Sequence, residues 1–179
     1  MVEPQHGLNE ACHVQQRILV RKGRADDVDA CIYLALIAAP DSDASIWRTS
    51  LLEDIAKSDR LLVVAERAEE VIGYGRVLRF VPEPDAPADI APSGYYLMGL
   101  VVHPDHRRRR VAAALTQARL DWISKHADDA WYFANARNAA SIALHAPFGF
   151  EEVTRSFFYP RVDFDRGDGV LFRLRFPSP

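Results

Sequence analysis

The sequence has few cysteines and no long apolar run, and both absences narrow the class of protein. Its only two cysteines are Cys12 and Cys31, too few for a disulfide framework and typical of a reducing cytoplasm. No segment is apolar over the length of a membrane span, and the N-terminus shows no signal-peptide pattern. We therefore expect a cytoplasmic protein with no membrane partner.

The sequence also has no excess of positive charge. It contains 22 Lys and Arg and 25 Asp and Glu, which gives a formal net charge of -3. This balance argues against a general nucleic-acid-binding protein. A chain of 179 residues, 49% of them hydrophobic, fits one domain with a substantial core. We expect Met1 to Gln16, which are polar and lack periodicity, to form a loosely ordered leader. The remaining residues, 17–179, are then a single domain.

The stretch from Tyr95 to Trp122 predicts a strand, a turn and a helix. Tyr95 to Val102 carry no charge and are mostly aromatic or branched, which is typical of a strand buried on both faces. Pro104 ends this strand. From about Arg109, apolar residues follow the spacing of one helical face, at Val111, Leu115, Ala118 and Trp122.

Four consecutive arginines, Arg107 to Arg110, occupy the turn before this helix. Cations at a helix start oppose the macrodipole, whose positive end favours anions. The free N–H groups of the first helical turn, together with the guanidinium groups, would suit a phosphate. A solvated basic turn and a nucleic-acid patch are the alternatives.

Two segments resemble the GNAT superfamily of acyl-CoA-dependent N-acyltransferases. Val102–Leu115 is similar to its coenzyme-binding motif, which is Arg or Gln, two residues, Gly, one residue, then Gly or Ala. Arg107, Arg110 and Ala112 stand at these positions, so an arginine replaces the middle glycine. Its β-carbon would crowd the pyrophosphate unless the chain keeps ordinary helical angles. Asn135–Phe150 is similar to the family's Asn-rich helix that ends in Gly-Phe.

The resemblance implies an α/β (α+β) fold: a mixed, mostly antiparallel central sheet of about seven strands, flanked by about four helices and splayed at the acetyl-CoA-binding strands. The periodicity of the chain predicts the same order of elements. The expected strands are Arg17–Arg21, Leu61–Ala65, Val71–Val81, Tyr95–Val102, Trp131–Ala136, Glu151–Tyr159 and Val170–Phe176. The expected helices are Ala25–Ala39, Ser45–Ser58, the one from about Arg109, and Asn138–Phe148, which should kink or end at Pro147 with Gly149 as its cap.

Gly99 interrupts an otherwise bulky strand, which indicates a bulge or simple packing beside a large neighbour. The resemblance implies a bulge beside which the pantetheine arm of acetyl-CoA pairs with the main chain. The same resemblance places the coenzyme against Leu100, Val101, Val102, Arg107, Arg108, Arg109, Arg110, Val111, Ala112, Asn138 and Ser141. For Asn138 and Ser141 the alternative is N-capping on the surface. Backbone N–H groups near Val101 are the candidate oxyanion donors.

Alignment on Gly149 and Phe150 places His145 where the family usually has the tyrosine that protonates the leaving thiolate. With an unperturbed pKa near ~6.5, His145 would keep a usable protonated fraction, although it could equally have no role.

The strand Tyr95–Val102 contains no acid, so the general base is not determined. Tyr95 or Tyr96 could relay a proton through water, and Glu83 or Asp85 could reach in from the proline-rich loop 82–92.

These patterns predict an acetyl-CoA-dependent N-acetyltransferase that acts by direct attack of a primary amine in a ternary complex. The acceptor is a small molecule or a peptide, and acidic loop residues weakly favour a cationic one. The alternative is a catalytically degenerate acyl-CoA-binding regulatory module of the same fold. We expect no nucleic-acid partner, and homodimer formation is left open. No metal site is expected at His103, Asp105 and His106, because neither cysteine is near them in sequence.

Overall fold

The computed structural model describes residues 17–164 and 168–177. The predicted leader, Met1 to Gln16, lies outside these residues. In the part of the chain that is described, no helix has both the length and the apolar character needed to cross a membrane.

The described residues form one open sheet of seven strands in the order β1-β2-β3-β4-β5-β7-β6. Neighbouring strands are antiparallel except β4 and β5, which are parallel. This confirms the mixed, mostly antiparallel sheet predicted from the sequence. The strands are β1 (Leu19–Lys22), β2 (Arg60–Arg67), β3 (Glu70–Phe80), β4 (Gly94–Val102), β5 (Asp129–Asn135), β6 (Glu151–Thr154) and β7 (Gly169–Arg175).

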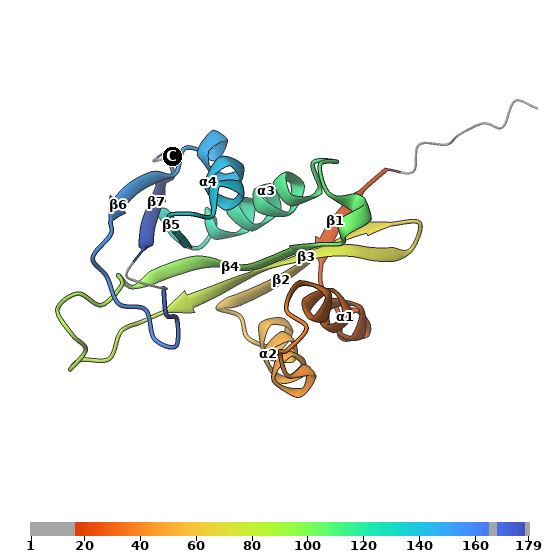
Figure 1. Ribbon diagram of the computed structural model, residues 1–179, viewed down its shortest axis with the longest axis horizontal. Coiled ribbons are helices and arrows are strands. Elements are labelled where there is room, and N and C mark those ends of the chain that lie inside the picture. The colour runs from red at the N-terminus through yellow and green to blue at the C-terminus, as the bar shows by residue number, and fades with distance from the viewer. Residues whose placement is uncertain (1–16, 165–167, 178–179) are drawn as a thin grey trace, which may run out of the picture.

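In the described part of the chain, four α-helices cover the two faces of the sheet (Figure 1). Helices α1 (Val28–Ala38) and α2 (Ala44–Ala56) lie on one face, and α3 (Val111–Ile123) and α4 (Ala139–His145) lie on the other. Strand β2 shows why both faces need cover, because its apolar side chains alternate in direction. Leu61 and Val63 join the core under α3, whereas Leu62 and Val64 join the core under α1 and α2.

Local side-chain and backbone chemistry sets both ends of α4, as expected from the sequence. The Asn138 side chain accepts from the Ser141 N–H and caps the start of the helix. Pro147 cannot continue the α-helical hydrogen bonds, so the chain passes into a 3-10 turn over Ala146–Phe148. Gly149 then closes that turn with φ 90 in the left-handed region.

Strand β6 is shorter than expected, because it ends at Thr154 and not at Tyr159. The following segment leaves the sheet edge and pairs instead with the loop between β3 and β4. Phe158 accepts from the Ala91 N–H and donates to the Asp89 carbonyl, at 2.8 Å each. A partner distant in sequence thus determines where β6 ends.

The sheet opens between β4 and β5, which confirms the predicted splay. The two strands share a single register pair, Tyr96 with Trp131. On the other side of β4, the register with β3 shifts between Tyr74 and Arg76. Gly99 lies in this bulge with φ 42, a left-handed conformation that glycine adopts without strain. The bulge bends β4, and the gap beside it forms the site described next.

Candidate active site

A cleft of about 750 Å³ lies in the gap between β4 and β5, beside α3 and α4. Its walls are β4 from Leu97 to Val102, the arginine turn with the first residues of α3, two aromatic residues of β5, and α4. The predicted site residues that line it are Leu100, Val101, Val102, Arg107, Arg108, Arg110, Val111, Ala112, Asn138, Ser141 and His145. Arg109 and Tyr96 are not among the residues that line it.

The bulge shapes the strand side of the cleft. Gly99 and Leu100 have no register partner on β3. Beside the bulge, where Gly73 pairs with Val102, a Cβ atom on Gly73 would lie 2.9 Å from the Val101 carbonyl oxygen. Only glycine therefore permits this close approach of the two strands. Gly99 and the three residues that follow it in the bent part of β4 line the cleft.

The arginine turn forms the other end of the cleft. Arg110 is the residue before α3 and has φ 62 and ψ 10, and Arg108 has φ 58. Arg110 therefore does not keep the ordinary helical angles that would have avoided crowding. The left-handed region costs a side-chain-bearing residue about 1–2 kcal/mol. The Nε group of Arg107 donates to the Val102 carbonyl oxygen at 3.2 Å, which fixes its stem against the end of β4.

His145 lies on α4 with only 5% of its surface exposed. Its ring stacks on Tyr132, with centroids 4.2 Å apart, and Phe150 meets it edge-on. Nδ1 is 2.8 Å from the Ser141 carbonyl oxygen. A carbonyl only accepts, so Nδ1 carries the proton. Nε2 is then a bare acceptor, and it is buried without a partner among the described residues.

Burial lowers the pKa of His145 to about 4, although the hydrogen bond to Ser141 acts in the opposite direction. The expectation of a usable protonated fraction near neutral pH is therefore wrong. The imidazole is neutral at neutral pH. It presents an acceptor, and not a proton, to its surroundings.

Tyr96 lies outside the cleft wall and belongs to an aromatic cluster that is separate from the core under α1 and α2. Its hydroxyl donates to the Pro92 carbonyl oxygen at 2.7 Å. Trp131 and Tyr159 pack against the ring. Burial raises the pKa of this hydroxyl. The geometry does not bring the suggested proton relay to the cleft.

The other suggested bases are also not in the cleft wall. Tyr95 packs against Trp122 at 5.4 Å between centroids, and Glu83 and Asp85 are exposed in the loop between β3 and β4. The described residues that line the cleft include no carboxylate. Within residues 17–164 and 168–177, no three His, Cys, Asp or Glu side chains are grouped to hold a metal ion.

The sequence analysis did not identify one buried charged residue of the cleft. Arg119 lines the cleft and is 1% exposed. It follows Leu115 by four residues and so lies on the buried face of α3, which continues to Ile123. The predicted Ala118 and Trp122 are only partly buried, at the edge of that face. An arginine spaced four residues after a core leucine was the available signal.

Comparison with known proteins gives consistent matches. The sequence profile of the Acetyltransferase (GNAT) family matches residues 28–150. Mycothiol acetyltransferase of Parafrankia sp. (strain EAN1pec) is 32% identical over 142 residues, which is 68% of this chain and 44% of that protein. The [ribosomal protein bS18]-alanine N-acetyltransferase of Escherichia coli (strain K12) is 35% identical over 80 residues, 44% of this chain and 53% of that protein.

The chain thus spans about half the length of these curated relatives. Among solved structures, YncA from Salmonella typhimurium, determined with its cofactor acetyl-CoA, superposes with a TM-score of 0.71 at 16% identity. The match covers 91% of this chain and 96% of that one. At this identity, the similarity concerns the fold.

Proposed function

Because the chain belongs to the GNAT family of acetyltransferases, we propose that it transfers the acetyl group of acetyl-CoA to a primary amine. The acceptor is a small molecule or a peptide, and the amine attacks directly in a ternary complex. The observation that carries this proposal is the cleft itself, which opens between two parallel strands and ends at an arginine turn.

The residues present fit acetyl-CoA as the acetyl donor. Arg107, Arg108 and Arg110 supply positive charge at one end of the cleft, and the N–H groups of the first turn of α3 add donors for phosphate oxygens. Val111 and Ala112 begin that helix. Arg109, although outside the wall, adds to the local positive charge.

The β4 side of the cleft suits an extended pantetheine arm. The main chain of Leu100, Val101 and Val102 offers hydrogen-bonding groups in the way that a sheet edge does. Asn138 and Ser141 face it from α4. Asn138 already caps that helix, so the N-capping alternative and a coenzyme contact are compatible.

In the reaction a C–N bond forms, the C–S bond breaks, and one proton moves from nitrogen to sulfur. We propose that Nε2 of His145 carries this proton. It accepts the proton from the attacking amine and then donates it to the leaving thiolate. Neutral imidazole is a weak base here, but negative charge developing on the thioester oxygen would raise its proton affinity. Backbone N–H groups of the bent β4 near Val101 are the proposed donors to that oxygen.

The finer features of the acceptor stay predictions. The acidic residues that weakly favoured a cationic amine lie in two loops. In the loop between β6 and β7, the described acidic residues are Asp163 and Asp168. Asp168 is paired with Arg137 at 2.8 Å. Homodimer formation and a cytoplasmic location are likewise predictions.

The first test is calorimetric titration with acetyl-CoA, dephospho-coenzyme A and pantetheine, followed by turnover assays on a panel of amines. We expect saturable binding that weakens as phosphates are removed. Arg107→Ala should weaken binding, whereas His145→Phe should lower turnover with affinity retained. Arg48→Ala is the matched control, because Arg48 is exposed and pairs with Asp29 on α1.

Three outcomes distinguish the alternatives. No binding by the unmodified protein would contradict the proposal. Binding without turnover of any amine would favour the degenerate acyl-CoA-binding module, for which the left-handed Arg110 in place of glycine is the supporting observation. Equal loss of binding in Arg107→Ala and His145→Phe would remove the assignment of His145.

A further inference from the structure

Arg119 is a buried cation whose partners are all neutral. Within the described structure its guanidinium donates to four oxygens, none of them a carboxylate. They are the Leu115 carbonyl at 3.3 Å, Thr116 Oγ1 at 2.9 Å, and the carbonyls of Arg76 and Met98 at 3.5 and 3.4 Å. Burial lowers its pKa to about 9. It is therefore still mainly charged near neutral pH.

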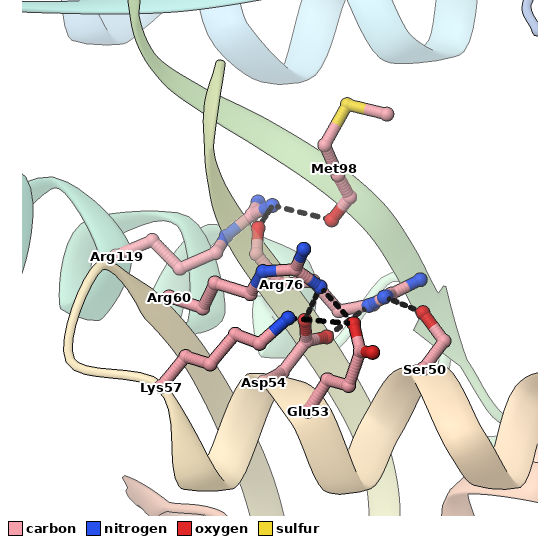
Figure 2. Close-up of polar contacts among 8 residues, drawn as sticks. All are labelled: Ser50, Glu53, Asp54, Lys57, Arg60, Arg76, Met98 and Arg119. Atoms are coloured by element: carbon pink, nitrogen blue, oxygen red, sulfur yellow. Dashed lines mark hydrogen bonds and ion pairs between the residues drawn. The ribbon is translucent and has the colours of Figure 1, made fainter. Parts of the chain in front are cut away.

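Such an arrangement is not favoured by stability alone. A buried charge without a counter-ion carries a desolvation penalty of several kcal/mol, and an apolar residue of similar volume is often more stable. The contrast with Arg76 is visible in Figure 2, where the Arg76 side chain extends to α2 and meets Asp54 and Ser50. Arg119 approaches from α3, and only its bonds to main-chain oxygens are drawn.

The guanidinium lies directly behind the bulge of β4. Arg76 and Met98, whose carbonyls it binds, are register partners at one side of the shift. Gly75 makes room for it, because a Cβ atom there would be 3.0 Å from Arg119 Nε. Removal of this side chain would therefore leave the bend of β4 without its support.

Arg119 also lies far along the cleft from the phosphate end. From Met98 to Val102 the strand advances four residues, about 13 Å in extended chain, before it reaches the arginine turn. His145 lines the same cleft. Burial is the main cause of its lowered pKa, and the positive charge of Arg119 adds to it. The two side chains thus interact electrostatically across the site.

We propose that Arg119 is a positioning residue for acetyl transfer. It holds the bent main chain through the carbonyls of Arg76 and Met98. It also keeps an unneutralised positive charge behind the bulge, where negative charge develops first on the thioester oxygen and then on the sulfur. A charge in such a poorly solvated place acts more strongly than one in water. This inference rests on the proposed function.

The experiment compares Arg119→Met, which fills a similar volume without charge, with Arg119→Lys, which keeps the charge. Leu120→Met is the control, since Leu120 is buried on the same helix and does not line the cleft. The first readout is the pKa of the thiol of bound coenzyme A, which is measured from the ultraviolet absorbance of the thiolate. This readout needs no amine acceptor. Coenzyme affinity, kcat and KM are measured alongside.

We expect the unmodified protein to hold the pKa of the bound thiol below that of free coenzyme A titrated in the same buffer. Arg119→Met should raise it by about one unit, a tenfold loss of thiolate at a given pH, and should lower kcat about tenfold or more with coenzyme affinity retained. Arg119→Lys should partly restore the low thiol pKa and part of the lost kcat.

An unchanged thiol pKa in Arg119→Met would overturn this inference alone, and so would an equal kcat loss in Leu120→Met. Failure of the unmodified protein to bind the coenzyme would overturn both this inference and the proposed function.

Discussion

Acidification should destabilise the folded protein through His145. Its pKa is lowered from 6.5 to about 4 in the folded state, whereas the unfolded chain keeps the ordinary value. Between these limits the unfolded state binds a proton that the folded state does not bind. The contribution of His145 to stability is therefore complete above pH 6.5 and is lost as the pH falls toward 4. At about 1.36 kcal/mol per pKa unit, the loss approaches about 3 kcal/mol.

Groups on several elements around the His145 ring determine its pKa. Burial contributes most, and the Arg119 charge on α3 acts in the same direction. Tyr132 on β5 contributes an apolar stacking face. The Ser141 carbonyl opposes the shift, because it accepts from Nδ1 and would also favour the charged ring.

The assay is urea unfolding of the unmodified protein and of His145→Phe at several pH values between about 7 and 4. Phe keeps the stacking on Tyr132 and does not titrate. We expect the unmodified protein to lose up to about 3 kcal/mol more than the variant over this range. His126→Gln is the control, because it removes an exposed imidazole that lies just after α3.

Other groups titrate in the same range but are common to both proteins. The pKa of Asp27 is lowered, chiefly by its hydrogen bonds from Arg21, so its stabilisation is also lost at low pH. Burial raises the pKa of Asp54 despite its pairing with Arg76, so its effect has the opposite sign. Both effects cancel in the difference between unmodified protein and variant. Parallel stability curves for the two proteins would refute the reasoning about His145.

Two further substitutions test the structure. Arg110→Gly should raise the free energy of unfolding by about 1 kcal/mol, because glycine adopts the left-handed conformation at φ 62 without strain. Arg109→Gly is the control, because this neighbouring residue does not have a positive φ, and it should not stabilise the protein. Equal effects of the two substitutions in thermal unfolding would argue against strain at Arg110. Asp54→Leu should lower the free energy of unfolding by about 3–5 kcal/mol, because it leaves the buried Arg76 unpaired. Adding Arg76→Leu should recover much of this loss in urea unfolding, and a further loss of similar size would show that the pair is not the cause.

The sequence determined those features that depend on neighbouring residues. The uncharged run from Tyr95 to Val102 predicted a strand that the structure places at Gly94–Val102, because eight residues without charge already favour burial. Pro147 and Gly149 predicted how α4 ends, since proline lacks the N–H and glycine tolerates the left-handed cap. The cleft-lining residues of the coenzyme motif were also found in advance, through a local pattern with a family resemblance.

Only the tertiary structure decided the features that depend on what packs against a residue. The sequence shows a histidine at position 145, but its tautomer and its lowered pKa come from Ser141, Tyr132 and burial. Tyr96 was a candidate relay until its neighbours placed it outside the cleft. The sequence analysis did not single out Arg119, and only its packing against β3 and β4 identifies it as a buried cation. Desolvation and strand register are set by residues distant in the chain, and no local pattern contains them.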